Sequence, residues 1–172
     1  LSAPGDAHPV RHDNKTRLRV SWRSLQPATF NTMPISMYSQ TIPLFVRLLT
    51  NLSGILDKTA AHCAEKKIDP AVLLGSRLFP DMFPLTRQVQ IGCDFAKGAA
   101  ARLSGREVPS WPDEEKTFED LKNRVRKALE YLATFTPADI DGSETKQITL
   151  KRGGQDVMMT GEEYLLCLLY TS

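Results

Sequence analysis

Apolar side chains recur every three or four residues along three long stretches of the chain, residues 39–66, 85–103 and 118–135. In the first stretch the stripe is formed by Ile42, Phe45, Leu49, Leu52, Leu56, Thr59 and Cys63. This spacing places side chains on one face of an α-helix, because each helical turn takes between three and four residues. Three helices that must each bury one face predict a helical bundle.

Capping patterns locate several helix ends. Asp69 followed by Pro70 is typical of the start of a short helix, with a carboxylate cap and proline at the first position. Thr117 and Asp120 have the spacing of a capping box, with Asp in place of the usual Glu or Gln. Asp81 is expected to cap the second long helix. These patterns divide the chain into separate helices joined by short connections.

The apolar period changes to two at residues 147–159, on both sides of a turn at 152–154. Alternation around a Gly-Gly pair predicts a small β-hairpin. Thr160 and Glu163 then form another capping box, so a further helix is expected to begin there. The predicted fold is therefore an all-α four-helix bundle, truncated before or within its last helix, with one small β-hairpin near 147–159.

Charge and composition exclude several classes of protein. Residues 1–32 hold five basic and two acidic residues, a balance of +3, and the rest holds 17 basic and 18 acidic, a balance of −1. A nucleic-acid binder carries its basic excess on the folded domain, so no nucleic-acid partner is predicted. No apolar run reaches the roughly 18 residues of a membrane span. Cys63 and Cys93 show no motif spacing, and without a secretory segment a cytoplasmic protein is expected.

The two ends of the chain differ from the middle. Residues 1–32 lack any apolar period and are predicted to be a disordered leader or an upstream region read through in frame, with a transit peptide as the alternative. The helical domain is expected at 33–166, where Met33 is a natural start. Residues 167–172 match the translation of a transposon-end adapter and are predicted to be a non-native tail. The alternative is a genuine short tail.

One connection is the best candidate for a binding site. The candidate ligand-binding residues are Arg77, Phe79, Asp81, Met82, Phe83 and Arg87. This segment, with its acidic residue between two prolines, could line a pocket at the end of a bundle. The alternative is a hydrophobic plug that joins two helices. By contrast, the acidic run 113–115 precedes a helix N-terminus, where negative charge suits the helix dipole, and the basic cluster 122–127 is expected to be a solvated face.

Several segments together carry a family resemblance. They are residues 35–38, 67–70, 77–85, 88–90, 97–103 and 118–121. Through them, residues 33–166 resemble the uncharacterised family numbered nineteen ninety-three among domains of unknown function, whose fold is similar to the DinB/YfiT-like bundles. The resemblance implies a four-helix bundle with a final helix, and it leaves the biochemical role unassigned.

The DinB/YfiT resemblance also implies an activity to consider. Many such relatives are metal-dependent, and some are thiol-dependent transferases or isomerases with a three-histidine site. Here His8 and His12 belong to the leader, and His62 alone lies in the domain. A zinc or nickel site needs about three protein ligands. No cofactor is therefore predicted, and a divalent metal with His62 as a ligand is expected only in a full-length protein.

Three functions stay open at this point. The first is an uncharacterised bundle domain that binds a small ligand or a partner, and the second is a DinB-type metal-dependent thiol transferase or isomerase. The third is a helix-turn-helix nucleic-acid binder using residues 70–76, which the charge balance disfavours. A truncated bundle would also leave a groove lined by parts of residues 42–56, 85–103 and 121–135, through which a homodimer is expected to form.

Overall fold

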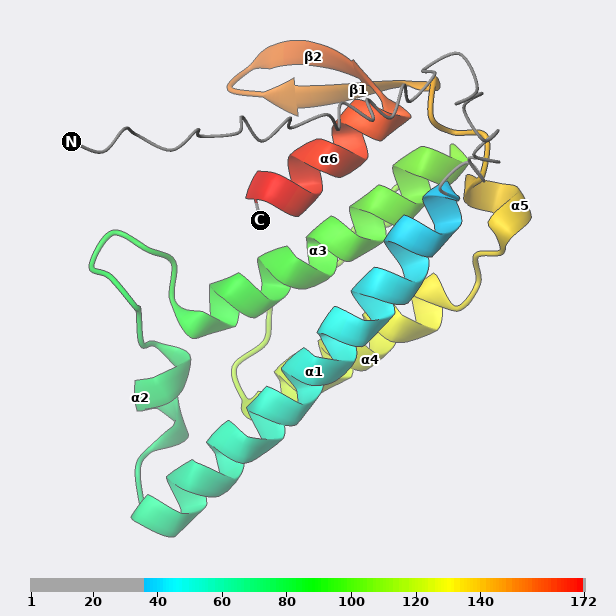
Figure 1. Cartoon of the computed structure of the whole chain (residues 1–172). Coiled ribbons are helices and arrows are strands. Elements are labelled where there is room, and N and C mark those ends of the chain that lie inside the picture. The colour runs from blue at the N-terminus through cyan, green and yellow to red at the C-terminus, as the bar shows by residue number, and fades with distance from the viewer. Residues whose placement is uncertain (1–35, 172) are drawn as a thin grey trace, which may run out of the picture. The chain divides into compact units, whose positions relative to one another are not determined.

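The structure is a computed structural model that describes residues 36–171. The predictions for residues 1–32 and for Met33 concern residues outside this range. The elements are α1 (Met37–Lys66), α2 (Pro70–Leu74), α3 (Leu85–Ser104), α4 (Phe118–Leu132), α5 (Pro137–Ile140), β1 (Gln147–Arg152), β2 (Gln155–Thr160) and α6 (Gly161–Thr171). The described chain is thus mostly helical, with one two-stranded antiparallel sheet in this part of the protein (Figure 1).

The three predicted long helices form the core. Helix α4 packs against both α1 and α3, and its apolar stripe is mostly buried, with Leu121 and Leu132 at 0% exposure and Leu129 partly buried. Leu56 of α1 is equally buried. Each such leucine contributes about 1.5–3 kcal/mol relative to an exposed position. The small residues Ala96 and Ala99 of α3 are buried as well, which allows close helix packing.

The first helix begins at a contact with a distant part of the chain. Ser36 caps α1 by accepting a hydrogen bond from the backbone N–H of Ser39. The Asp141 carboxylate accepts two further bonds, from the Ser36 hydroxyl at 2.8 Å and from the Tyr38 backbone N–H at 2.9 Å. At its other end α1 stops at Lys67, which has a left-handed conformation with φ 54°. The N-terminus of α1 therefore depends on residues beyond α5.

Three predicted caps are present, including the box of Thr160 and Glu163 at the last described helix, and one is wrong. The Asp69 carboxylate caps α2 by accepting a hydrogen bond from the Ala71 backbone N–H. Thr117 and Asp120 form the complete capping box of α4. Asp81 caps no helix, because α3 begins at Leu85 after Pro84 and has no side-chain cap. A ten-residue loop, residues 75–84, separates α2 from α3. Helix-turn-helix motifs join their helices by turns of about three or four residues, so this alternative does not fit.

The end of α4 also differs from the prediction. The apolar stripe predicted a helix as far as Phe135, but α4 stops at Leu132. Phe135 is still buried, at 3% exposure, because the chain turns and keeps its ring in the core. Thr136 and Asp139 then form a further capping box that begins the short helix α5. The apolar pattern therefore extends beyond α4, because Phe135 is buried by tertiary packing although it lies outside the helix.

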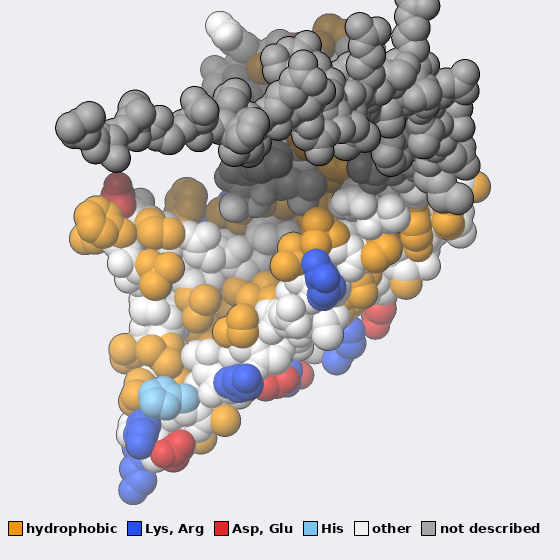
Figure 2. Space-filling model, in the orientation of Figure 1, with side chains coloured by type: hydrophobic (Ala, Val, Ile, Leu, Met, Phe, Trp, Pro, Cys, Tyr) orange, Lys and Arg blue, Asp and Glu red, His pale blue; other side chains and the backbone are white. Residues whose placement is uncertain are grey.

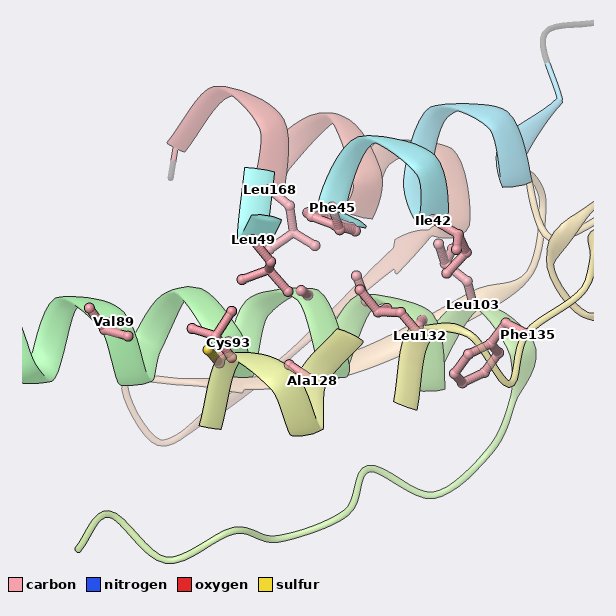
Figure 3. Packing of buried hydrophobic residues seen from close by; sticks show 14 of the residues in the cluster. Ile42, Phe45, Leu49, Val89, Cys93, Leu103, Ala128, Leu132, Phe135 and Leu168 are labelled. Atoms are coloured by element: carbon pink, nitrogen blue, oxygen red, sulfur yellow. The ribbon is translucent and has the colours of Figure 1, made fainter. Parts of the chain in front are cut away.

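The predicted hairpin and the helix after it are both present. Strands β1 and β2 pair in antiparallel register around Gly153 and Gly154, whose φ angles of 59° and 83° suit glycine. Helix α6 follows and continues to Thr171, past residue 166. Its Leu168 is buried, at 9% exposure, and its side chain points toward Phe45 and Leu49 (Figure 3). The truncation of the bundle and the non-native tail at 167–172 stay predictions.

Helices α1 and α3 each expose some large apolar side chains. Leu48 and Ile55 on α1 are 51% and 56% exposed, and Phe95 on α3 is 40% exposed. The predicted groove included the α4 stripe, but that stripe is buried, so only α1 and α3 contribute these side chains. Homodimer formation through this surface stays a prediction. No helix in the described range is long and apolar enough to cross a membrane.

Candidate functional site

The α2–α3 loop, residues 75–84, exposes large apolar side chains. Leu78 is 93% exposed, Phe79 65% and Phe83 58%. Beside them lies a cavity of about 350 Å³ lined by Ser76, Arg77, Leu78, Met82, Phe83, Leu85 and Gln88. Hydrophobic side chains gather over this loop and α2 in the space-filling view (Figure 2). Such a concentration of exposed apolar surface is typical of a binding site.

Polar side chains hold this loop in place through its backbone. The Arg77 guanidinium donates to the Met82 carbonyl at 2.6 Å, and the Gln88 amide donates to the Phe83 carbonyl at 3.3 Å. The Leu85 N–H donates to the carbonyl of Ser76 at 2.9 Å, which ties the start of α3 to the end of α2. The loop therefore has a defined shape although its apolar side chains face outward.

The structure separates the six predicted ligand-binding residues into two groups. Arg77, Met82 and Phe83 line the cavity in the loop, and Phe79 and Asp81 are exposed outside its lining. Arg87 lies on α3, and its guanidinium forms an ion pair with Asp113. That contact assigns Arg87 to a second group of residues, which surrounds the connection between α3 and α4.

This connection, residues 106–116, is called the strap, and it is attached to a buried arginine. The Arg124 side chain on α4 is only 2% exposed and pairs with Glu115 at 2.8 Å, Asp113 at 2.9 Å and Asp94 at 3.0 Å. It also donates to the Pro112 carbonyl at 2.9 Å. Its Nε atom is buried and has no hydrogen-bond partner among the described residues.

Cations surround the Trp111 ring of the strap. The Nζ atoms of Lys97 and Lys127 lie 4.4 Å and 4.8 Å from the ring centroid, and the Arg124 guanidinium carbon lies 5.9 Å from it. Cations at such distances are attracted to the face of a tryptophan ring. The ring and the carboxylates of the strap therefore both compensate positive charge from α3 and α4.

This charge cluster changes the acidity of its members. Burial raises the pKa of Glu115, but hydrogen bonds from Arg124 and Gln90 outweigh it and hold the pKa below its usual value. Burial raises the pKa of the neighbouring Cys93 thiol to about 12. Glu115 is therefore held as a carboxylate, and burial, which outweighs the nearby charges of Arg124 and Lys97, keeps the Cys93 thiol protonated.

The strap cluster corrects a prediction made from the sequence. The basic cluster 122–127 was expected to be a solvated face, yet Arg124 is buried and pairs with Asp113 and Glu115 of the acidic run. A signal was present, because Arg124 stands three residues after Leu121 on the buried stripe of α4. A cavity of about 390 Å³ adjoins the cluster, lined by Trp111, Pro112, Glu114, Glu115, Asp120, Asn123, Arg124 and Lys127.

The described residues do not provide the ligands of a three-histidine metal site. His62 is exposed on the C-terminal part of α1. Among residues 36–171, no group of three His, Cys, Asp or Glu side chains is arranged to hold a metal ion. The metal-dependent alternative therefore requires ligands from outside this range, and the role of His62 as a ligand stays a prediction.

The fold and these two sites define a mostly helical domain with a small hairpin before its last described helix. The family described as Domain of unknown function (DUF1993) matches residues 37–171, so the chain belongs to this family. A crystal structure of a DinB family member protein from Shewanella denitrificans is similar, with 38% sequence identity, 78% of each chain covered and a TM-score of 0.69. No curated protein matches the chain. The family resemblance predicted from the sequence is thus confirmed.

Proposed function

We propose that this protein is a non-catalytic domain that binds a small ligand with an apolar body and an anionic group in the α2–α3 loop. The observation that carries the proposal is the cavity of about 350 Å³ among the exposed side chains of this loop. Ligand pockets are commonly about 300–1,000 Å³, mostly apolar, with a few polar groups that orient the ligand. The loop cavity fits this description.

The lining residues suggest how such a ligand would bind. Leu78, Met82 and Phe83 offer apolar contact, and covering them would remove exposed hydrocarbon from water, which is favourable by about 25 cal/mol per Å². Arg77 uses one guanidinium nitrogen on the Met82 carbonyl, which leaves further N–H groups for an acceptor. A carboxylate or sulfonate on an apolar body would use both features.

Anilinonaphthalene sulfonate is a suitable probe, because it joins an apolar ring system to an anion. We expect Phe83→Ser and Arg77→Gln each to weaken its binding by roughly tenfold, and we expect octanoate to displace it from the unchanged protein. Leu48→Ser is the matched control, since Leu48 is an exposed apolar residue on α1, outside the cavity. Fluorescence titration measures all four effects.

Other outcomes would reject this proposal. If Leu48→Ser weakens probe binding as much as Phe83→Ser, the probe reports general apolar surface and not the loop cavity. If octanoate fails to displace the probe while a second protein chain protects the loop from proteolysis, the loop is a docking surface for a protein partner and not a small-molecule site.

A further inference from the structure

The cavity beside the strap has a lining unlike that of the α2–α3 loop. Trp111 and Pro112 form an apolar wall, and five charged side chains share the remainder with Asn123. We propose that this cavity binds a small zwitterion, a molecule that carries an ammonium group, a carboxylate group and an apolar side group. Glu114 and Lys127 would bind the two charges, and Trp111 would contact the apolar side group.

Three of the five charged groups, Arg124, Glu115 and Asp120, already have partners within the fold. The Glu115 carboxylate accepts from Arg124 and from the Gln90 amide, both at 2.8 Å. Asp120 accepts from the backbone N–H groups of Lys116 and Thr117, at 3.1 Å and 3.0 Å. These contacts hold the strap and begin α4, so neither carboxylate is left to balance the charge of a ligand.

Glu114 and Lys127 are in a different situation. Both side chains belong to exposed residues, and neither forms an ion pair within the described part of the chain. A ligand with only a negative charge would be attracted by Lys127 and repelled by Glu114. A ligand with only a positive charge would be attracted by Glu114 and repelled by Lys127. A ligand with both charges satisfies both residues, which is why a zwitterion fits this lining best.

Arg124 also lines the cavity. Its side chain is only 2% exposed, and its Nε–H has no acceptor among the described residues. Buried donors in proteins are nearly always paired. Because this Nε atom is buried from solvent, the ligand does not reach it, and Arg124 contributes to the cavity only as part of its wall.

Calorimetric titration of the full chain tests the proposal with three related probes. L-leucine carries both charges, 4-methylpentanoate lacks the ammonium group, and 3-methylbutylamine lacks the carboxylate. We expect L-leucine to bind at least about tenfold more tightly than either single-charge analogue. Glycyl-L-leucine, whose charges lie further apart, distinguishes a free amino acid from a peptide as the source of this chemistry. Preference for either of these two zwitterions supports the proposal.

Matched variants locate the binding. Lys127→Gln and Glu114→Gln should each weaken L-leucine or dipeptide binding by about tenfold. Lys58→Gln and Glu130→Gln are the controls, because these residues are exposed, carry the same charges and lie outside the cavity lining. The proposal is overturned if no zwitterion binds at millimolar concentration, if the single-charge analogues bind equally well, or if the controls weaken binding as much as the cavity variants. Phe83→Ser should leave this binding unchanged, which separates it from the function proposed for the loop.

Discussion

The α2–α3 loop and the strap are both non-helical connections to α3, but they differ in how far their side chains contact the rest of the domain. The loop exposes its large apolar residues and is held by hydrogen bonds to its own backbone carbonyls. The strap places its carboxylates around a buried arginine and its tryptophan among three cations. The loop therefore leaves its apolar side chains open to a partner or ligand, and the strap is fixed to the helical core by its ion pairs.

This difference has an energetic meaning. An exposed apolar side chain contributes little to the stability of the monomer, because it stays in contact with water in the folded and unfolded states. A buried charge cluster is sensitive to the loss of any member, since the remaining charges are left without compensation in a poorly solvated place. Substitutions in the two connections should therefore differ mainly in their effect on folding.

The largest effect is expected at Arg124. Arg124→Met should lower the free energy of unfolding by about 3–5 kcal/mol, because the half-buried Glu115 and its more exposed neighbours Asp94 and Asp113 lose their buried partner. Urea denaturation measures this loss. Arg126→Met is the control on the same helix, since Arg126 is exposed, and it should change stability by no more than about 0.5 kcal/mol. Equal effects from the two variants would mean that the strap cluster does not stabilise the fold.

A smaller effect should appear in acid. The pKa of Glu115 is lower in the folded protein than its ordinary value of 4.5, so its contribution to stability is complete above that value. The contribution is lost as the pH falls through the lower, folded-state pKa. We expect the stability of the unchanged protein to fall more steeply between about pH 5 and pH 2 than that of Glu115→Gln. Parallel curves from urea titrations at each pH would contradict the assignment.

The smallest effect is expected in the loop. Leu78→Ser should change the free energy of unfolding by no more than about 0.5 kcal/mol, since Leu78 is 93% exposed. Thermal and urea denaturation should therefore give nearly the same midpoint as the unchanged protein. A loss of more than about 1 kcal/mol would show that the loop packs against the domain, and the contrast with the strap would disappear.

The same contrast shows what the sequence could predict. The three helices, the hairpin at Gly153 and Gly154, and the capping box of Thr117 depend on short-range spacing, and all were predictable. Arg124 was not, because its carboxylate partners come from α3 and from the strap, outside its own helix. The sequence shows that a charged residue stands on an apolar stripe, but it does not show which distant residues compensate it.

The candidate loop was predicted in part for the same reason. Its apolar residues and its prolines marked it as unusual, and three of the six named residues line the cavity. Asp81 was assigned a capping role from its local pattern, but the bond from Leu85 to Ser76 ties the start of α3 to the end of α2 instead. Arg87 was assigned to the loop by proximity in sequence, and its ion pair with Asp113 places it with the strap.

The contact between Asp141 and the start of α1 bears on the order in which the protein is assembled. A ribosome releases the segment of α1 early, but the carboxylate that accepts from the Tyr38 N–H follows 103 residues later. Until that residue has emerged, the first turn of α1 lacks this contact and is free to fray. Among the described helices, the one that is synthesised first therefore has its N-terminal end secured only after residue 141 has been translated.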